Sequence, residues 1–206
     1  SALTDVVLSE GVTNIANSAF DGCTELTNIT IPNSVTRIGA DAFQGCISLT
    51  SVSLPANITS IASDVFGGCK KLSNVFIPQN VTSIGDWAFH DNNTPFVVYY
   101  GGSEADWDNI SISSSNLSLN SAAIHCNSTH ICTLRSVAEQ APTATQNGNH
   151  AYWLCSICQQ AYKDAGGIAQ TTVEAETIPA GTIAYGSCGQ YLNWTLHGSG
   201  ELVVYG

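Results

Sequence analysis

Apolar residues recur along the first half of the chain with a step of 23 positions. The step is clearest over residues 26–48, which read LTNITIPNSVTRIGADAFQGCIS, and it returns in three to four copies. The apolar positions of one copy are Leu26, Ile29, Ile31, Val35, Ile38, Ala42 and Phe43. One copy buries little surface alone, whereas stacking successive copies about 4.8 Å apart makes each apolar position a continuous column. The pattern therefore predicts a mainly β solenoid built from 23-residue coils.

Within each copy, apolar and polar side chains alternate around Ile29 and Ile31, which is the pattern of a short strand with one buried face. Pro32 and its equivalents Pro55 and Pro78 end this strand, because proline has no N–H to donate to a ladder. A period of about 20–29 residues with the core Leu-x-x-apolar-x-apolar is typical of a leucine-rich repeat.

The array changes at its C-terminal end, where a coil that protects the core from solvent is expected. Ser103 with Asp106 three residues later is the signature of a helix N-terminus. Trp107 is large enough to cover the open end of the core, and two further short strands are expected within residues 110–124. We therefore assign residues 1–124 to a solenoid with a C-terminal cap.

Side chains on the outward side of the repeated strands change from polar to aromatic along the array. Solenoids bind partners on such extended faces, and exposed aromatic side chains are common binding anchors. The candidate ligand-binding residues are Asn28, Thr30, Ser51, Ser53, Asn74, Phe76 and Tyr99. A second interpretation is that Phe76 and Tyr99 only pack against the module that follows.

Eight cysteines fall into two groups. Cys23, Cys46 and Cys69 share one repeat position, and no histidine recurs beside them, so we expect them to act as small buried apolar residues. The other five lie beyond the solenoid and need a separate explanation.

Residues 125–170 form a predicted small β module rich in metal-ligand residue types. His130 and Cys132 precede a Cys155-x-x-Cys158 knuckle that directly follows a predicted strand. These four residues are the candidate ligands of a structural zinc ion, since such sites pair one knuckle with a second pair of ligands. Only one residue separates His130 from Cys132, which is an unusual spacing, so disulfides or plain thiols remain open alternatives.

Residues 171–206 are predicted to be a linker followed by a β-hairpin. Residues 192–196 and 202–205 alternate in polarity and flank a glycine-rich turn, which favours two antiparallel strands. A lone hairpin is marginally stable, and the sequence contains no methionine, so we expect the sequence to be part of a longer protein.

Charge and motifs exclude several classes of function. The chain has 5 Lys and Arg against 16 Asp and Glu, and its net charge of -11 disfavours binding to nucleic acid or to anionic lipid. No run of about 18 apolar residues could span a membrane. The sequence has no Gly-x-Ser-x-Gly elbow, no His-Glu-x-x-His and no glycine-rich phosphate loop, so we predict that it is not an enzyme.

The repeat units resemble the BspA-like leucine-rich repeats of bacterial surface proteins. The strings AFQGC at residues 42–46 and VTSIG at residues 81–85 carry this resemblance, as does YYGGSEADW at residues 99–107. It implies an exported or cell-wall-associated protein with adhesive or protein-binding roles.

Residues 152–158, YWLCSIC, resemble a second module of bacterial surface proteins. Its usual form has one His and three Cys, but here Cys132 stands at the place of its His and Ala144 at the place of a Cys. If those residues form a metal site in that module, this copy has lost one ligand and exchanged another.

The sequence therefore predicts a non-catalytic binding module of a bacterial surface or secreted protein, extracellular or attached to the cell wall. Its partner would be a protein or a glycan on a host or bacterial surface. No cofactor is expected apart from the possible structural zinc ion. The alternative is a structural spacer that presents another domain of a longer surface protein.

Overall fold

The chain forms two compact units, residues 1–131 and residues 132–206. The computed structural model describes residues 3–92, 96–140, 148–158, 160–163, 167, 170–171, 177–178, 182–188, 192–197 and 202–205. The sequence-based boundary after residue 124 falls inside the last solenoid strand, which ends at His125. No helix within these described ranges is long and apolar enough to cross a membrane.

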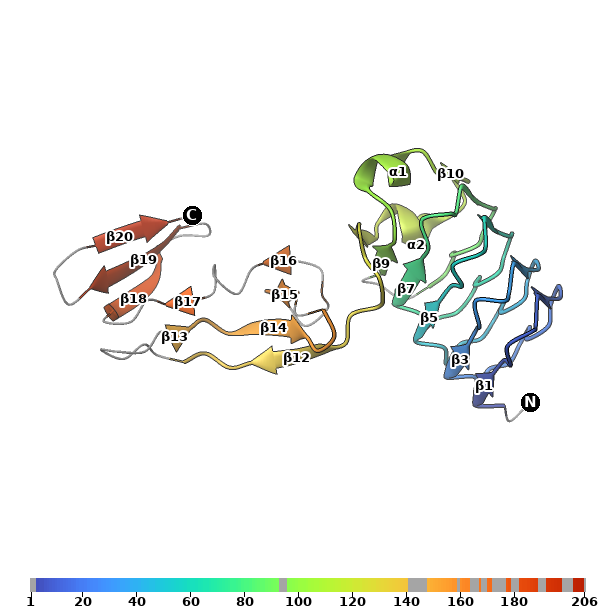
Figure 1. Ribbon diagram of the computed structural model, residues 1–206, viewed down its shortest axis with the longest axis horizontal. Coiled ribbons are helices and arrows are strands. Elements are labelled where there is room, and N and C mark those ends of the chain that lie inside the picture. The colour runs from blue at the N-terminus through green and yellow to red at the C-terminus, as the bar shows by residue number, and fades with distance from the viewer. Residues whose placement is uncertain are drawn as a thin grey trace. The chain divides into compact units, whose positions relative to one another are not determined.

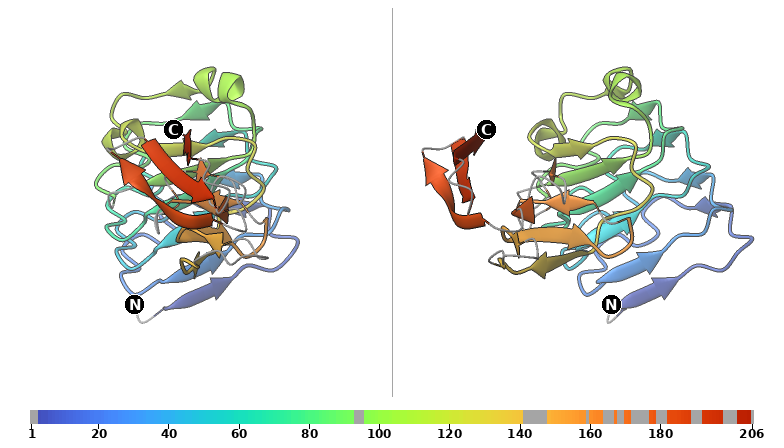
Figure 2. Two further views of the ribbon diagram at one scale, coloured as in Figure 1. Left: turned by 90° about the vertical axis from the view of Figure 1, so that its left-hand side faces the viewer. Right: turned by 60° about the vertical axis from the view of Figure 1, so that its left-hand side comes forward.

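The first unit is a solenoid with two faces of short strands, as Figures 1 and 2 show. One face carries β1 (Asp5–Val7), β3 (Asn28–Thr30), β5 (Ser51–Ser53), β7 (Asn74–Ile77), β9 (Val97–Tyr100) and β11 (Ala123–His125). The second face carries β2 (Asn14–Ile15), β4 (Arg37–Ile38), β6 (Ser60–Ile61), β8 (Ser83–Ile84) and β10 (Ser111–Ile112). The strand pairs of both faces are parallel, and most join positions 23 residues apart, such as Val52 with Val75. The predicted solenoid with 23-residue coils is confirmed.

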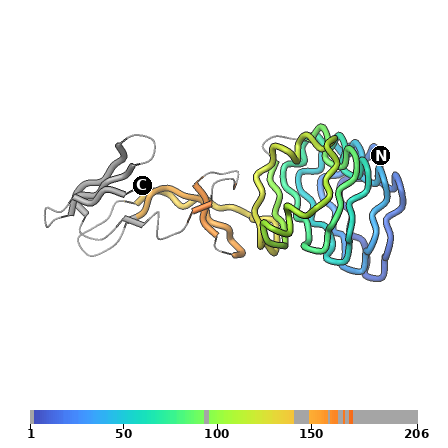
Figure 3. Tube along the Cα trace, turned by 90° about the horizontal axis from the view of Figure 1, so that it is seen from above, coloured from blue at the N-terminus to red at the C-terminus, as the bar shows by residue number. Residues whose placement is uncertain are grey.

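Successive coils of the solenoid stack on one another (Figure 3), and the core consists of columns of identical or similar side chains, one from each coil. The rings of Phe20, Phe43, Phe66 and Phe89 stack with centroids 5.2, 5.4 and 5.5 Å apart. Leu26, Leu49, Leu72, Phe43 and Phe66 are completely buried. Each column removes apolar surface from water only because the next coil covers it.

Two corner positions of each coil need a left-handed backbone. Ser18, Asp41, Asp64 and Trp87 share the first position and have φ between 54° and 60°. Gly22, Gly45, Gly68 and Asp91 share the second, with φ between 53° and 69°. Glycine, and to a lesser degree Asp or Asn, tolerates this conformation, which explains the repeated residue types at both corners.

Two of the three repeat cysteines, Cys46 and Cys69, are buried thiols that donate to the backbone of the preceding coil, while Cys23 in the first coil is half-buried. Cys46 Sγ donates to Phe20 O at 3.2 Å and Cys69 Sγ to Phe43 O at 3.1 Å. Burial raises the pKa of both thiols to about 12. Asn92 occupies the equivalent position in the next coil, and its amide donates to Phe66 O at 3.0 Å. The side chain changes, but the hydrogen bond between coils is retained.

The C-terminal end of the solenoid is closed by α1 (Glu104–Asp108) and α2 (Leu117–Asn120). α1 has the predicted capping box of Ser103 and Asp106, and the hydrogen bonds from Ser103 lower the pKa of the Asp106 carboxyl. Trp107 packs edge-on against Tyr100, with ring centroids 5.3 Å apart. The expected strand at residues 110–112 is β10, whereas residues 117–120 are helical and only β11 beyond them is a strand.

Asn116 is the polar centre of this cap. It is fully buried, its Oδ1 accepts from the N–H of Phe89, and its Nδ2 donates to Gly85 O, both at 3.0 Å. Its side chain thus forms hydrogen bonds with backbone groups of the last full coil, which have no partner in a further coil.

The second unit is antiparallel. Its first sheet has the order β12 (Leu134–Val137), β14 (Tyr152–Cys155), β15 (Ala161–Tyr162) and β16 (Gln170–Thr171). β13 (Gly148–Asn149) pairs with β17 (Thr177–Ile178), and β18 (Thr182–Cys188), β19 (Leu192–His197) and β20 (Leu202–Tyr205) form a further sheet. The predicted hairpin corresponds to β19 and β20, while the sequence did not predict β18 as its third strand. The predicted turn at residues 198–200 lies outside the described residues.

Candidate functional sites

The predicted outward face is present, but it is open only along its first four coils. Asn28, Thr30 and Ser53 are exposed, and Ser51, Asn74 and Phe76 are partly exposed. Tyr99 is 1% exposed, so it is not available as a binding anchor, and for this residue the structure agrees with the second interpretation, in which the residues that follow cover it. β11 adds one more strand beside β9. His125 pairs with Tyr99 in register, and its ring packs against the Tyr99 ring at a tilt of 33°, with centroids 5.4 Å apart.

A hollow of about 500 Å³ lies at the edge of this face. Ser53 and Phe76 line it from β5 and β7, and Pro55 and Pro78 line it where those strands end. The segment Ser128–His130 borders the hollow as well. An aromatic ring beside two prolines and a hydroxyl is a surface that suits a mixed apolar and hydrogen-bonding contact.

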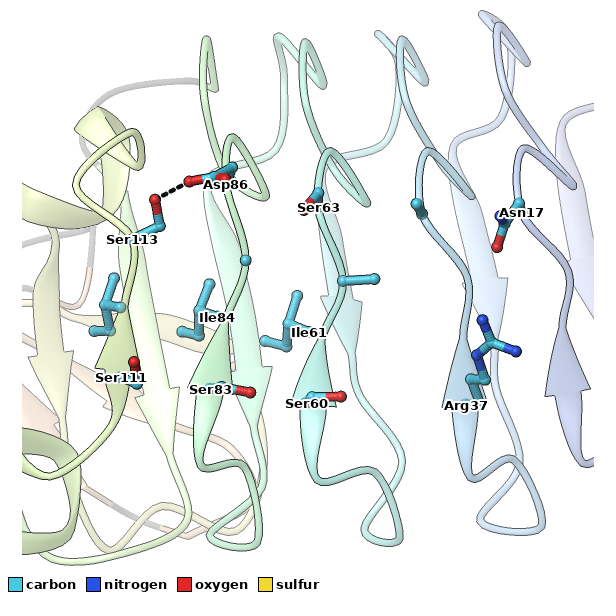
Figure 4. Close-up of a pocket in the computed structure, with 14 residues that line it drawn as sticks. Asn17, Arg37, Ser60, Ile61, Ser63, Ser83, Ile84, Asp86, Ser111 and Ser113 are labelled. Atoms are coloured by element: carbon cyan, nitrogen blue, oxygen red, sulfur yellow. Dashed lines mark hydrogen bonds between the residues drawn. The ribbon is translucent and has the colours of Figure 1, made fainter.

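A second groove, of about 570 Å³, lies along the other strand face (Figure 4). Ser60, Ser83 and Ser111 stand in register on β6, β8 and β10, and Arg37 lies farther along the same side. At one end, the Ser113 hydroxyl donates to the Asp86 carboxylate. This groove was not predicted from the sequence. The available signal was the polar residue that precedes the inward-facing Ile in each coil.

An exposed tryptophan stands at one solenoid corner. Trp87 is 48% exposed and has φ of 60°, at the position where other coils have Ser or Asp. His90 packs edge-on against it with centroids 5.2 Å apart, and the Nδ1 of His90 lies 3.7 Å from Asp64 Oδ1. The change from Ser18, Asp41 and Asp64 to Trp was the sequence signal for this corner, and the sequence-based interpretation did not use it.

The four predicted metal-ligand residues come together in the structure. One ligand atom from each of His130, Cys132, Cys155 and Cys158 lies within 4.8 Å of every other. The Sγ atoms of Cys132 and Cys158 are 3.9 Å apart, and Cys132 Sγ is 3.2 Å from the hydroxyl of Tyr162. Burial raises the pKa of the Cys132 thiol to about 12, although the hydrogen bond with Tyr162 acts to lower this pKa. The seven cysteines whose side chains the structure describes form no disulfide with one another.

Strand register explains why these residues meet. β12 pairs with β14 so that Leu134 lies opposite Cys155, which places Cys132, two residues earlier, beside the turn that follows Cys155. The backbone N–H of Ser156 donates to Thr133 O at 3.0 Å and continues this pairing into the turn. The N–H of Cys155 donates to Gln160 O at 2.8 Å, which closes the turn that carries Cys158.

Comparison with known families decides what the first unit is. Residues 1–102 match a family model described as BspA type Leucine rich repeat region, in six copies. Residues 1–102 are BspA-type leucine-rich repeats. The family resemblance of the repeat strings is thereby confirmed, and this repeat type is generally non-catalytic and typical of protein interaction.

Three solved bacterial proteins are similar to this chain. A leucine rich cell surface protein from Faecalibacterium prausnitzii A2-165 is 34% identical, with a TM-score of 0.42 over 53% of this chain and 35% of that chain. A leucine-rich repeat protein from Bacteroides ovatus ATCC 8483 is 27% identical, with a TM-score of 0.49 over 61% and 30%. A leucine-rich repeat protein from T. pallidum is 28% identical, with a TM-score of 0.38 over 48% and 59%.

The chain therefore spans between 30% and 59% of the length of these three proteins. No curated protein matches it.

Proposed function

We propose that this chain is a non-catalytic binding module of a bacterial surface or secreted protein. It acts outside the cell or at the cell wall, and it binds a partner through the open strand face of the solenoid. The observation that carries this proposal is the hollow where Phe76 emerges beside Ser53. BspA-type repeats are of a kind typically used in protein interaction, which supports the proposal.

The face has the chemistry of an uncharged contact. The described columns on β3, β5 and β7 present Asn, Thr and Ser side chains and then one aromatic ring, with no Lys, Arg, Asp or Glu. Binding here would rest on apolar contact and neutral hydrogen bonds, so it should change little with salt concentration. A protein partner fits the proline- and phenylalanine-lined hollow best, and a surface glycan is the second candidate because hydroxyl and amide groups line the rest of the face.

The test compares two substitutions in one column of the same face. Val7 and Phe76 occupy equivalent strand positions 69 residues apart, and Val7 is 75% exposed on β1, away from the hollow. The probes are biotinylated surface proteins from epithelial cells and from bacteria, together with an immobilised glycan array. Phe76→Ser should weaken binding at least about tenfold, as expected for an aromatic anchor, while Val7→Ser leaves it unchanged.

Thermal unfolding of both variants verifies that the solenoid is intact. If no probe binds the wild type, or if Phe76→Ser and Val7→Ser bind equally well, the spacer interpretation replaces this proposal.

A further inference from the structure

We propose that His130, Cys132, Cys155 and Cys158 bind one structural zinc ion. Their ligand atoms all lie within 4.8 Å of one another. Zn–S bonds of about 2.3 Å in a tetrahedral site place two sulfur atoms roughly 3.8 Å apart. The separation between Cys132 Sγ and Cys158 Sγ, 3.9 Å, equals that spacing closely. His130 also borders the hollow beside Phe76, but the two proposals rest on different observations and are tested by different experiments.

The scaffold holds the three thiols before any metal is added. Antiparallel pairing of β12 with β14 fixes Cys132 beside the turn, and the Cys155–Gln160 hydrogen bond closes that turn around Cys158. His130 precedes Cys132 by only two positions, so the chain itself keeps its imidazole near the thiols. The unusual spacing between His130 and Cys132 therefore does not prevent metal binding, because the pairing of β12 with β14 brings the ligand atoms together.

The set of donors selects the metal and its role. Three thiolates and one imidazole are soft ligands of the type that hold tetrahedral zinc, whereas calcium and magnesium prefer oxygen. Four protein ligands fill the tetrahedron and leave no position for a substrate, which makes the site structural.

Neighbouring side chains supply the outer hydrogen bonds that metal ligands require. Tyr162 is 1% exposed, and its hydroxyl, 3.2 Å from Cys132 Sγ, would donate to the thiolate. The hydroxyl of Thr129 lies 3.0 Å from Nδ1 of His130. When Nδ1–H donates to Thr129, the lone pair stands on Nε2, which would then face the metal.

A metal bound here would also cross-link the first sheet of the second unit. In the described part of this sheet, the buried apolar cluster consists of Tyr152, Leu154 and Ala161, with Val137 packed against it. Small modules are often held together by metals or disulfides. Cys155 is completely buried at the end of β14, so a metal bound to it and to Cys132 would join β14 to the segment that leads into β12.

A disulfide is the rival. One S–S bond of about 2.05 Å could join only two of the three cysteines, and it would leave the third cysteine and His130 without a role. The convergence of all four side chains favours the metal.

The test uses the whole 206-residue chain without a histidine tag. The reduced protein is loaded with zinc, passed through a desalting column and analysed for metal by mass spectrometry. Cobalt is then substituted, because tetrahedral cobalt bound to thiolates has intense visible bands and a near-ultraviolet thiolate band. We expect one zinc per chain, and a cobalt spectrum whose thiolate band corresponds to three sulfur ligands.

Single substitutions assign the ligands. Cys155→Ser and Cys158→Ser should each lose most of the bound zinc, and His130→Ala should keep the thiolate band but weaken zinc binding at least about tenfold. Cys126→Ser is the matched control, since Cys126 lies four positions before His130 and outside the cluster, and its zinc content should equal that of the wild type.

The wild-type measurements decide the question even if a variant fails to fold. Less than stoichiometric zinc after loading overturns the proposal. A cobalt spectrum without thiolate bands, or a disulfide among these cysteines in protein alkylated under non-reducing conditions, overturns it as well.

Discussion

The two units of this chain are stabilised in different ways. In the solenoid, each coil contributes one Phe and one Leu to columns that run through neighbouring coils, and these columns form one continuous core. In the described part of the second unit, the buried apolar cluster is confined to one place on one sheet. Repetition makes a core from coils that could not fold alone, whereas the proposed zinc ion would cross-link the first sheet of the second unit at one point.

The largest effect is expected from breaking a solenoid column. Phe66→Ala removes a fully buried ring stacked between Phe43 and Phe89, and it should lower the free energy of unfolding of the solenoid by about 3–5 kcal/mol. Phe20→Ala, at the partly exposed end of the same column, should cost clearly less. Urea unfolding followed by circular dichroism measures both. Equal losses would contradict the idea that the column is stabilised by neighbours on both sides.

A smaller effect is expected at the thiol cluster of the second unit. Tyr162→Phe keeps the buried ring and removes only the hydroxyl near Cys132 Sγ, so zinc affinity should fall about 10–100-fold. Competition with a zinc chelator gives the affinity, and solenoid stability should not change. Unaltered affinity would mean that the Tyr162 hydroxyl makes no contribution to the site.

The smallest effect is a gain in solenoid stability. Trp87 holds a left-handed backbone that costs a bulky residue about 1–2 kcal/mol, and Asn accepts this conformation more easily. Trp87→Asn should therefore raise the free energy of unfolding by about 0.5–1 kcal/mol, because relief of the backbone strain is expected to exceed the loss of the contact between the half-exposed ring and His90. Trp87→Phe keeps both the ring and the strain, so it should give no gain. A loss in Trp87→Asn would show that packing of the ring on His90 outweighs the strain.

The sequence predicted the solenoid better than the second unit, because only the solenoid is built from repeats. The 23-residue period placed the strands and the buried residues because each coil repeats the environment of the last. Tyr99 broke this rule. Its neighbour His125 lies 26 positions on, outside the period, so the repeat did not identify which residue would cover it, although a further strand was expected in this region.

The thiol cluster could be predicted as a set of residues but not as a geometry. Spacing along the sequence made His130 and Cys132 look like a poor ligand pair, since the register between β12 and β14 is not visible in the sequence. Asn116 carried no signal either, because its role depends on backbone groups of the last full coil that only the folded array leaves unpaired.

Hydrogen–deuterium exchange of the whole chain, with zinc and after removal of zinc by a chelator, tests most directly whether the two units are stabilised differently. Removing zinc should speed exchange at least about 100-fold in residues 134–137 and 152–155, because these strands would lose their cross-link. The solenoid strands β3 to β8 should keep their protection in both states. Equal protection of β12 and β14 with and without zinc would contradict the account, and so would a simultaneous loss of protection in the solenoid.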